Sequence, residues 1–321
     1  MALQTVKIVD IGGSGIRAAK IGIADGIPIE RINLHECAIP SIPLNGAFYS
    51  ELEIQELYNS ILEAANSFDN SSDNSDVHFL ATAGFRSSTN YRRITDRLLK
   101  QNINVTIVSK DDEARYIGSA ACTFIAATYP ELKKDTVLVA KTGGGSTEEI
   151  IYSDDNCKSI SFPIGVIPLK RELDRSKPRI SNVVEIITTL TEQTIDLADG
   201  YKIDTTIFCG RMMKRIAKAL VYAISKNKRI SIDEDRLTVD LVSIQQLIDA
   251  LEENNSNRIF KDYGIKASSK TRYLAAALSM KAVLNASRSN HALVSPYAMR
   301  EGFAIDVVKA SYGADELLIS N

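Results

Sequence analysis

The chain has 321 residues, which is more than one hydrophobic core usually holds, so its length predicts two domains. A net charge of −2, with 24% charged residues, argues against a dedicated nucleic-acid binder, which would carry a strongly basic surface. No apolar run approaches the roughly 20 residues of a membrane span, and the N-terminus enters a predicted strand almost at once. We therefore expect a soluble, cytoplasmic protein that binds neither nucleic acid nor a membrane.

The four cysteines form no C-x-x-C pair and match no zinc-binding spacing. Cys122 and Cys209 stand among apolar residues, so both are expected to be buried thiols. This usage of cysteine indicates a reducing compartment.

A glycine-rich hairpin is predicted near the N-terminus. Apolar and β-branched residues predict strands over residues 5–11, 16–23 and 28–39, and the sequence DIGGSG separates the first two. Glycine has no Cβ, so the backbone can approach a ligand closely, and its N–H groups then suit an anion such as phosphate. The candidate phosphate contacts in this loop are Asp10, Gly12, Gly13 and Ser14.

Arg86 lies at a predicted junction between a strand and a helix. A helix over 51–68 precedes a strand over 77–81, and Arg86 follows that strand before a basic helix over 91–101. A strand end of small residues, followed by an arginine and a helix start, suits a site at the carboxyl edge of the strand. A salt bridge with a surface carboxylate is an equally good interpretation.

Glu113 lies near the start of the next predicted helix, over 109–128, after a short strand over 105–108. Ser109 suits the N-cap of this helix, and Asp111 and Asp112 complement the helix dipole in its first turn. Glu113 lies further in, where its carboxylate can face a cleft rather than solvent.

The second half repeats the plan of the first, after a boundary that we place between residues 130 and 131. Strands are predicted over 136–141, 146–153 and 157–163, with GGGSTE between the first two. An isolated triple glycine is most often an ordinary hairpin turn, but two such loops favour two similar domains, each presenting a phosphate loop to a shared cleft. The candidate phosphate contacts here are Lys141, Gly143, Gly144, Gly145, Ser146 and Thr147, with Lys141 at the position of Asp10.

The remaining chain is predicted as alternating helices and strands. Arg211 opens one helix after Gly210 and is a further candidate cation in the cleft. Ser243 begins a sequence that resembles a capping box, and residues 226–240 are polar and of uncertain form. The predicted helices cover 167–173, 181–197, 211–225, 244–253 and 268–286, the last of these amphipathic, and the predicted strands cover 205–209 and 292–294. A final helix reaches about residue 310, and we expect it to cross back to the first domain.

Six motifs, taken together and in this order, resemble the exopolyphosphatase / guanosine pentaphosphate phosphohydrolase (Ppx/GppA) family, a member of the actin-like ATPase-domain superfamily. They are DIGGSG at 10–15, ATAGFR at 81–86 with Asn90, SKDDEAR at 109–115, GGGSTE at 143–148, SFPIG at 161–165 and AMREG at 298–302. The resemblance implies an α/β fold of two actin-like (ribonuclease H-like) domains, 1–130 and 131–321, whose mixed sheets flank a central cleft.

The resemblance also implies hydrolysis of a terminal phosphoanhydride bond in inorganic polyphosphate or pppGpp. Glu113 occupies the position of the family's proposed base for the attacking water, and Arg86 that of its phosphate-facing arginine. Mg²⁺ is the usual metal, and Asp10 and Glu148 are its expected ligands here. We expect polyphosphate or a guanosine polyphosphate as the partner, and a homodimer.

Lys141 departs from the family pattern, because it replaces an aspartate that helps to hold the metal and the nucleophilic water. A charged lysine cannot ligate Mg²⁺. It could contact a phosphate oxygen directly, or it could pair with Glu113 and disable the base. The alternative function is therefore a catalytically impaired sensor that binds polyphosphate or a guanosine polyphosphate. An ATP-dependent kinase of the same superfamily fits less well, because the motifs at 112–115 and 298–302 do not belong to those groups.

Overall fold

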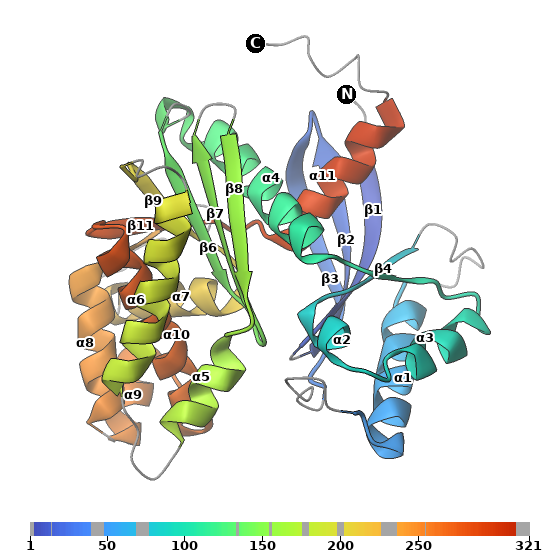
Figure 1. Ribbon diagram of the computed structural model, residues 1–321, viewed down its shortest axis with the longest axis horizontal. Helices are drawn as coiled ribbons and strands as arrows, with labels where there is room; N and C mark the ends of the chain where they lie inside the picture. The colour runs from blue at the N-terminus through green and yellow to red at the C-terminus, as the bar shows by residue number, and fades with distance from the viewer. Residues whose placement is uncertain are drawn as a thin grey trace. The chain divides into compact units, whose positions relative to one another are not determined.

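The computed structural model describes residues 3–13, 15–39, 48–68, 77–132, 135–153, 156–174, 180–197, 202–225, 236–253 and 255–312. The chain divides into unit 1, Met1–Thr123 with Met299–Asn321, and unit 2, Phe124–Ala298 (Figure 1). The sequence placed the boundary after residue 130, whereas the units divide earlier, inside helix α4 (Lys110–Thr128). Among the helices in these ranges, none combines the length and the hydrophobicity that a bilayer crossing requires.

Unit 1 is built on a mixed sheet with the strand order β3-β2-β1-β4-β5. The first three strands form the predicted antiparallel meander, and the last two run parallel to β1. These strands are β1 (Gln4–Gly12), β2 (Gly15–Ala24), β3 (Ile27–Cys37), β4 (Val77–Ala81) and β5 (Val105–Ile107).

Helix α1 (Glu51–Asn66) packs against this sheet through its apolar face. A capping box fixes its start, since the Ser50 side chain accepts the Glu53 N–H and the Glu53 carboxylate accepts the Ser50 N–H. Helical spacing brings Ile54, Leu57 and Ile61 to one face, and all three are buried in the core of unit 1. The other helices of the unit's first part are α2 (Ala83–Ser87), α3 (Arg92–Leu99) and the start of α4.

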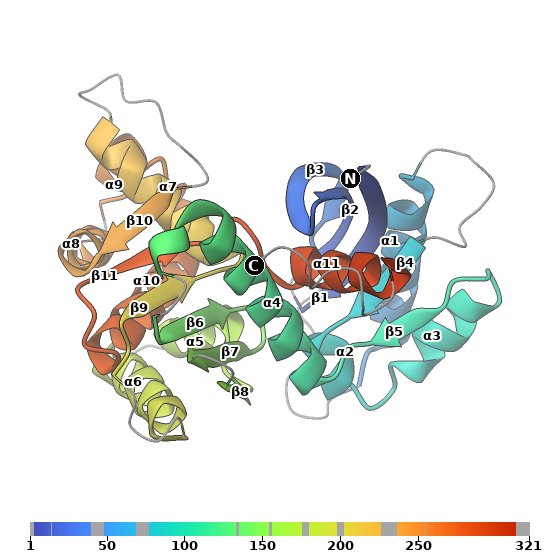
Figure 2. The ribbon, with the colours of Figure 1, turned by 90° about the horizontal axis from the view of Figure 1, so that it is seen from above.

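The last helix, α11 (Met299–Tyr312), packs against β1, β2 and β3 of unit 1 (Figure 2). It also approaches α4 closely, because a Cβ built on Gly302 would lie 1.8 Å from the Tyr116 carbonyl oxygen. Phe303 makes an edge-to-face contact with Tyr116, and Asp306 forms a salt bridge with Arg115. On its other side α11 is tied to β3 by the Glu301–Arg31 salt bridge, 2.8 Å long.

Unit 2 contains a mixed sheet with the order β10-β11-β9-β6-β7-β8. Figure 1 shows β6, β7 and β8 side by side as an antiparallel meander, and β9 and β11 run parallel to β6. The strands are β6 (Val137–Thr142), β7 (Thr147–Ser153), β8 (Asn156–Phe162), β9 (Thr205–Phe208), β10 (Leu237–Asp240) and β11 (His291–Val294).

The duplicated plan that the glycine loops predict is present in the two sheets. The order β3-β2-β1-β4-β5 in unit 1 matches β8-β7-β6-β9-β11 in unit 2, with the same strand directions at each step. In this match β1 corresponds to β6 and β2 to β7. The shared cleft between the two domains stays a prediction.

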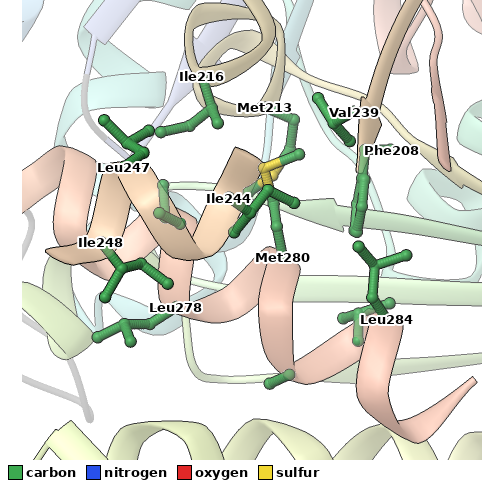
Figure 3. Packing of buried hydrophobic residues seen from close by; sticks show 14 of the residues in the cluster. Phe208, Met213, Ile216, Val239, Ile244, Leu247, Ile248, Leu278, Met280 and Leu284 are labelled. Carbon is green, nitrogen blue, oxygen red and sulfur yellow. The ribbon is translucent and has the colours of Figure 1, made fainter. Parts of the chain in front are cut away.

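Helix α10 (Lys270–Ala286) lies at the centre of the unit 2 core, and its predicted amphipathic character is wrong. Every residue from Leu274 to Met280 is buried, because α5, α6, α7 and α8 all pack against this helix. Figure 3 shows part of the core, where Met213, Ile244 and Met280 come together. The surrounding helices are α5 (Val166–Leu173), α6 (Ile180–Leu197), α7 (Arg211–Ser225), α8 (Leu241–Glu252) and α9 (Ser256–Tyr263).

Two local predictions are also wrong. Asp240, and not Ser243, caps α8: its carboxylate accepts the Ser243 N–H (2.8 Å), so the helix begins at Leu241. Cys122 is exposed, because it lies on the outer face of α4, whereas Cys209 is buried as expected.

Candidate functional site

The first glycine hairpin joins β1 to β2, with Gly12 opposite Gly15. A Cβ on Gly15 would lie 2.6 Å from the Cys37 carbonyl oxygen, so the absence of a side chain lets β3 close over the hairpin. Gly13 is half-buried at the turn, and Ser14 lies outside the described residues.

Asp10, the candidate ligand in β1, forms a cross-strand ion pair. Its Oδ2 atom lies 3.1 Å from Arg17 Nη1, and the register of the hairpin places the two residues directly opposite each other. The Asp10 side chain is 10% exposed and that of Arg17 is 20% exposed. The carboxylate is therefore largely enclosed and already has a cationic partner.

Arg86 and Glu113, the two candidate catalytic residues, are brought together in unit 1. Arg86 Nη1 donates to Glu113 Oε2 at 2.9 Å and also to the Val108 carbonyl oxygen. Glu113 is 1% exposed and Arg86 is half-buried, so the interpretation of Arg86 as a partner of a surface carboxylate is wrong. The alternative in which Lys141 pairs with Glu113 stays a prediction.

Ser109 caps the start of α4 as the sequence predicts. Ser109 Oγ accepts the Asp112 N–H at 3.0 Å, and the Ser109 carbonyl oxygen accepts the Glu113 N–H. Asp112 Oδ2 accepts the Ser109 hydroxyl in return. With its first turn closed in this way, α4 directs Glu113 inward and leaves Asp111 exposed.

Asn90, the last residue of the second motif, has a structural role. Its side chain accepts the Tyr49 N–H and donates to the Tyr49 carbonyl oxygen, both at 2.9 Å. It thus holds the chain just before α1 against the segment that follows α2.

The second glycine hairpin, between β6 and β7, is anchored by hydrogen bonds from the N-terminus of α5. The Gly143 carbonyl oxygen accepts the Val166 N–H and that of Gly144 accepts the Ile167 N–H, both at 2.9 Å. Gly165 makes this approach possible, since a Cβ there would lie 2.7 Å from both carbonyl oxygens.

This anchoring fixes the direction of the loop's N–H groups. In a planar trans peptide the C=O and the following N–H point in opposite directions, and the described chain contains no cis peptide. Because the carbonyls of Gly143 and Gly144 point to α5, the N–H groups of Gly144 and Gly145 point away from it. Neither N–H has an acceptor in the described part of the chain, so the loop presents two successive donors of the kind that bind anions.

The hydroxyl groups predicted to help in this loop are used within unit 2. Thr147 Oγ1 donates to the Ile164 carbonyl oxygen at 2.6 Å, and Ser146 Oγ donates to Glu148 Oε1. Both residues are buried. The backbone N–H groups are therefore better candidates for phosphate contacts than these side chains.

Lys141 pairs with Glu148 across the same hairpin, with 3.0 Å between Nζ and Oε2. The Glu148 side chain is fully buried and its Oε1 atom accepts from Ser146 and, at 3.5 Å, from Ser161. The Lys141 side chain is 16% exposed. A Cβ on Gly143 would lie 4.0 Å from its ammonium, which places this charge beside the loop.

The two hairpins carry the same cross-strand pair with opposite polarity. Asp10 on β1 faces Arg17 on β2, and Lys141 on β6 faces Glu148 on β7. The first strand thus contributes an acid in unit 1 and a base in unit 2. Arg211 follows Gly210 at the start of α7, and a Cβ on Gly210 would lie 3.3 Å from Lys141 Cγ, so α7 begins beside the lysine stem.

Comparison with known proteins identifies the family. The model of the Ppx/GppA phosphatase family matches residues 43–311. The chain belongs to the Ppx/GppA phosphatase family. The family resemblance of the sequence is confirmed, and membership indicates an exopolyphosphatase-type phosphohydrolase in general terms. No curated protein is significantly similar to the chain.

Solved structures of Ppx/GppA proteins share this fold. The family member from Aquifex aeolicus is 20% identical, with a TM-score of 0.74 over 97% of this chain and 99% of that one. An exopolyphosphatase from Cytophaga hutchinsonii is 18% identical, with a TM-score of 0.77 over 96% of this chain and 98% of that one. The predicted α/β fold class is thereby confirmed.

The residues predicted to hold Mg²⁺ in this Ppx/GppA chain do not fit that ion. Mg²⁺ needs oxygen ligands with open coordination. Glu148 is fully buried and both of its oxygens accept from protein donors, one of them an ammonium. Asp10 is paired with Arg17. In the described ranges no group of three or more His, Cys, Asp or Glu side chains is placed to hold a metal.

Sequence reasoning missed Arg17 as the partner of Asp10, and it named Glu148 as a metal ligand without its pairing with Lys141. The signal was available, because a hairpin in which Gly12 faces Gly15 must place Asp10 opposite Arg17. The same count from Thr142 opposite Thr147 places Lys141 opposite Glu148. The role of α5 as the support of the loop carried no such signal, because it depends on tertiary packing at Gly165.

Proposed function

We propose that this chain hydrolyses the terminal phosphoanhydride bond of inorganic polyphosphate or of pppGpp. The observation that carries the proposal is the orientation of the second glycine hairpin, whose Gly144 and Gly145 N–H groups point away from α5. Successive backbone donors of this kind suit a phosphate group. Membership of the Ppx/GppA phosphatase family supports a phosphohydrolase and leaves the substrate within that class to be tested.

In the proposed reaction Glu113 is the general base. Its carboxylate takes a proton from a water molecule as the water oxygen attacks the terminal phosphorus. The bond between this phosphorus and the bridging oxygen breaks, and the electron pair leaves on the shortened chain. Arg86, 2.9 Å from Glu113, holds the carboxylate in place. Because Glu113 is buried, water must reach it beside this ion pair.

Replacing Glu113 tests this assignment. We expect Glu113→Gln to lower kcat for phosphate release about 100-fold or more, the usual contribution of a positioned general base. Phosphate release is measured from polyphosphate and from pppGpp, with Mg²⁺ and with EDTA. Asp111→Asn, which removes an exposed carboxylate from the same helical turn, is the matched control and should retain activity.

Activity and stability measured together distinguish a catalytic role of Glu113 from a purely structural one. Glu113→Gln also leaves Arg86 with a neutral partner, so thermal unfolding of each variant must show that the fold survives at the assay temperature. Full activity in folded Glu113→Gln would remove Glu113 from the mechanism. No phosphate release by the wild-type chain from either substrate would refute the hydrolase itself.

One observation favours a second function, a sensor that binds the same substrates without efficient turnover. Lys141 stands where the family resemblance expects a carboxylate, and its ammonium is already engaged by Glu148. Such a site keeps its affinity for anions but lacks a group that helps to hold the nucleophilic water. Tight calorimetric binding of pppGpp or polyphosphate without phosphate release would support the sensor, and rapid turnover by the wild-type chain would exclude it.

A further inference from the structure

We infer that the glycine hairpin of unit 2 binds a phosphate group without a divalent cation, because the Lys141 ammonium supplies the positive charge at this loop. The inference rests on the proposed function, since it concerns the same phosphate chain. The inference goes beyond the proposed function because it names the group that takes the place of a metal ion.

The ion pair between Lys141 and Glu148 has its positive end nearer to solvent than its negative end. The carboxylate is fully buried and is fixed by Ser146 and Ser161, whereas the lysine side chain is partly exposed. The pair is neutral as a whole, but an anion that approaches the loop meets its positive end first. An ammonium can donate to several acceptors at once, so it can hold Glu148 and a phosphate oxygen together.

The backbone of the loop adds donors to this charge. The Gly144 and Gly145 N–H groups point away from α5, and the Lys141 ammonium lies beside Gly143 at the start of the same loop. A fixed ammonium and two backbone donors satisfy a phosphate group with charge and hydrogen bonds together. The oxygen ligands that a divalent cation would need are instead committed to protein donors.

The unit 1 hairpin shows that this arrangement is particular to unit 2. The equivalent strand there carries Asp10, with its cation Arg17 on the neighbouring strand. Reversal of the pair exposes an ammonium where the equivalent strand of unit 1 carries a carboxylate. The second hairpin therefore combines the glycine donors with a lysine at the strand position where the first hairpin has Asp10.

Calorimetric titration of the full chain with tripolyphosphate, in EDTA and in Mg²⁺, tests the inference. We expect binding in EDTA, with a Kd within about threefold of that in Mg²⁺, and a loss of about 10-fold or more in Lys141→Met, the order expected for a lost charge-assisted hydrogen bond. Lys141→Arg keeps the charge and should lose less. Lys158→Met removes an exposed lysine from β8 and is the matched control.

A second variant controls for the destabilisation that Lys141→Met causes by leaving a buried charge unpaired. Lys141→Met leaves Glu148 buried without its cation, so the double variant Lys141→Met with Glu148→Gln removes both charges together, and it should also bind at least about 10-fold more weakly. Loss of wild-type binding in EDTA, or wild-type affinity in the folded double variant, would overturn the inference.

Phosphate release from the same samples separates this inference from the proposed hydrolase. Binding in EDTA that depends on Lys141, without any phosphate release, would leave the inference standing and refute the hydrolase. Phosphate release that requires Mg²⁺, with no binding in EDTA, would support the hydrolase and refute the inference.

Discussion

At the scale of single residues, Glu149 is the least expected side chain of the second hairpin. Glu149 follows Glu148 in the sequence and is also fully buried. Its side chain points to α6, where Thr191 Oγ1 donates to Glu149 Oε1 at 2.7 Å. Its Oε2 atom is buried and has no hydrogen-bond partner among the described residues. Burial raises the pKa of this carboxyl from 4.5 to about 7.

The pKa of Glu149 predicts a pH dependence of stability. Between pH 4.5 and about 7 the folded chain retains a proton that the unfolded chain has lost, so the free energy of unfolding falls as the pH rises through this range. The loss is of the order of 3 kcal/mol. Glu149→Gln should abolish this part of the dependence and leave the wild type less stable than the variant at pH 8.

Chemical denaturation at several pH values measures this effect. Glu192→Gln, which removes an exposed carboxylate from α6, is the control and should keep the wild-type profile. If the wild type and Glu149→Gln have parallel profiles from pH 5 to 8, Glu149 does not titrate in this way.

At the scale of elements, the contact between α4 and α11 positions the Glu113 region. Tyr116 lies one helical turn after Glu113 on α4, and its carbonyl oxygen lies where a Cβ on Gly302 would fall. Gly302→Ala would force the two helices apart. We expect it to lower the free energy of unfolding by roughly 3 kcal/mol, at the upper end of overpacking effects, and to reduce phosphate release as Glu113 shifts.

Lys309→Ala on the exposed side of α11 is the control for this prediction, and it should change stability by less than about 0.5 kcal/mol. Denaturant unfolding and phosphate release are measured on both variants. A folded Gly302→Ala variant with wild-type stability would mean that α11 can move away from α4 at no cost.

Most elements were predictable because their periodicity is strong. Alternation and glycine turns predicted both meanders, and helical spacing predicted α1, α6 and α7. The short helices α2 and α9 and the edge strand β10 were missed, since four to eight residues carry too little pattern. Helix α10 was misjudged as amphipathic because its burial depends on neighbours distant in sequence.

The candidate site was predictable in part for a similar reason. The residues Arg86 and Glu113 followed from motifs, and the structure joins them in one ion pair. The direction of the Gly144 and Gly145 N–H groups did not follow from the sequence, because it depends on where α5 packs. The hydrogen bonds that Ser146 and Thr147 make to Glu148 and to the Ile164 carbonyl oxygen also did not follow from the sequence.

At the scale of the whole molecule, the chain consists of two units that repeat one sheet plan and differ in the polarity of one ion pair. Duplication explains why two glycine hairpins occur at equivalent places. The reversed pair explains why the two hairpins need not have the same role: an acid on the first strand of unit 1 and a lysine on that of unit 2. We propose the second hairpin as the phosphate site, because its Gly144 and Gly145 N–H groups point away from α5 and the Lys141 ammonium lies beside Gly143.

The most direct test of the account is a hydrolysis experiment in ¹⁸O-labelled water with polyphosphate as substrate. Water attack on the terminal phosphorus predicts one labelled oxygen in each released phosphate and none in the shortened chain. Label in the shortened chain, or terminal phosphate transferred to an acceptor without label, would contradict the proposed reaction, as would the absence of any release from folded wild-type protein.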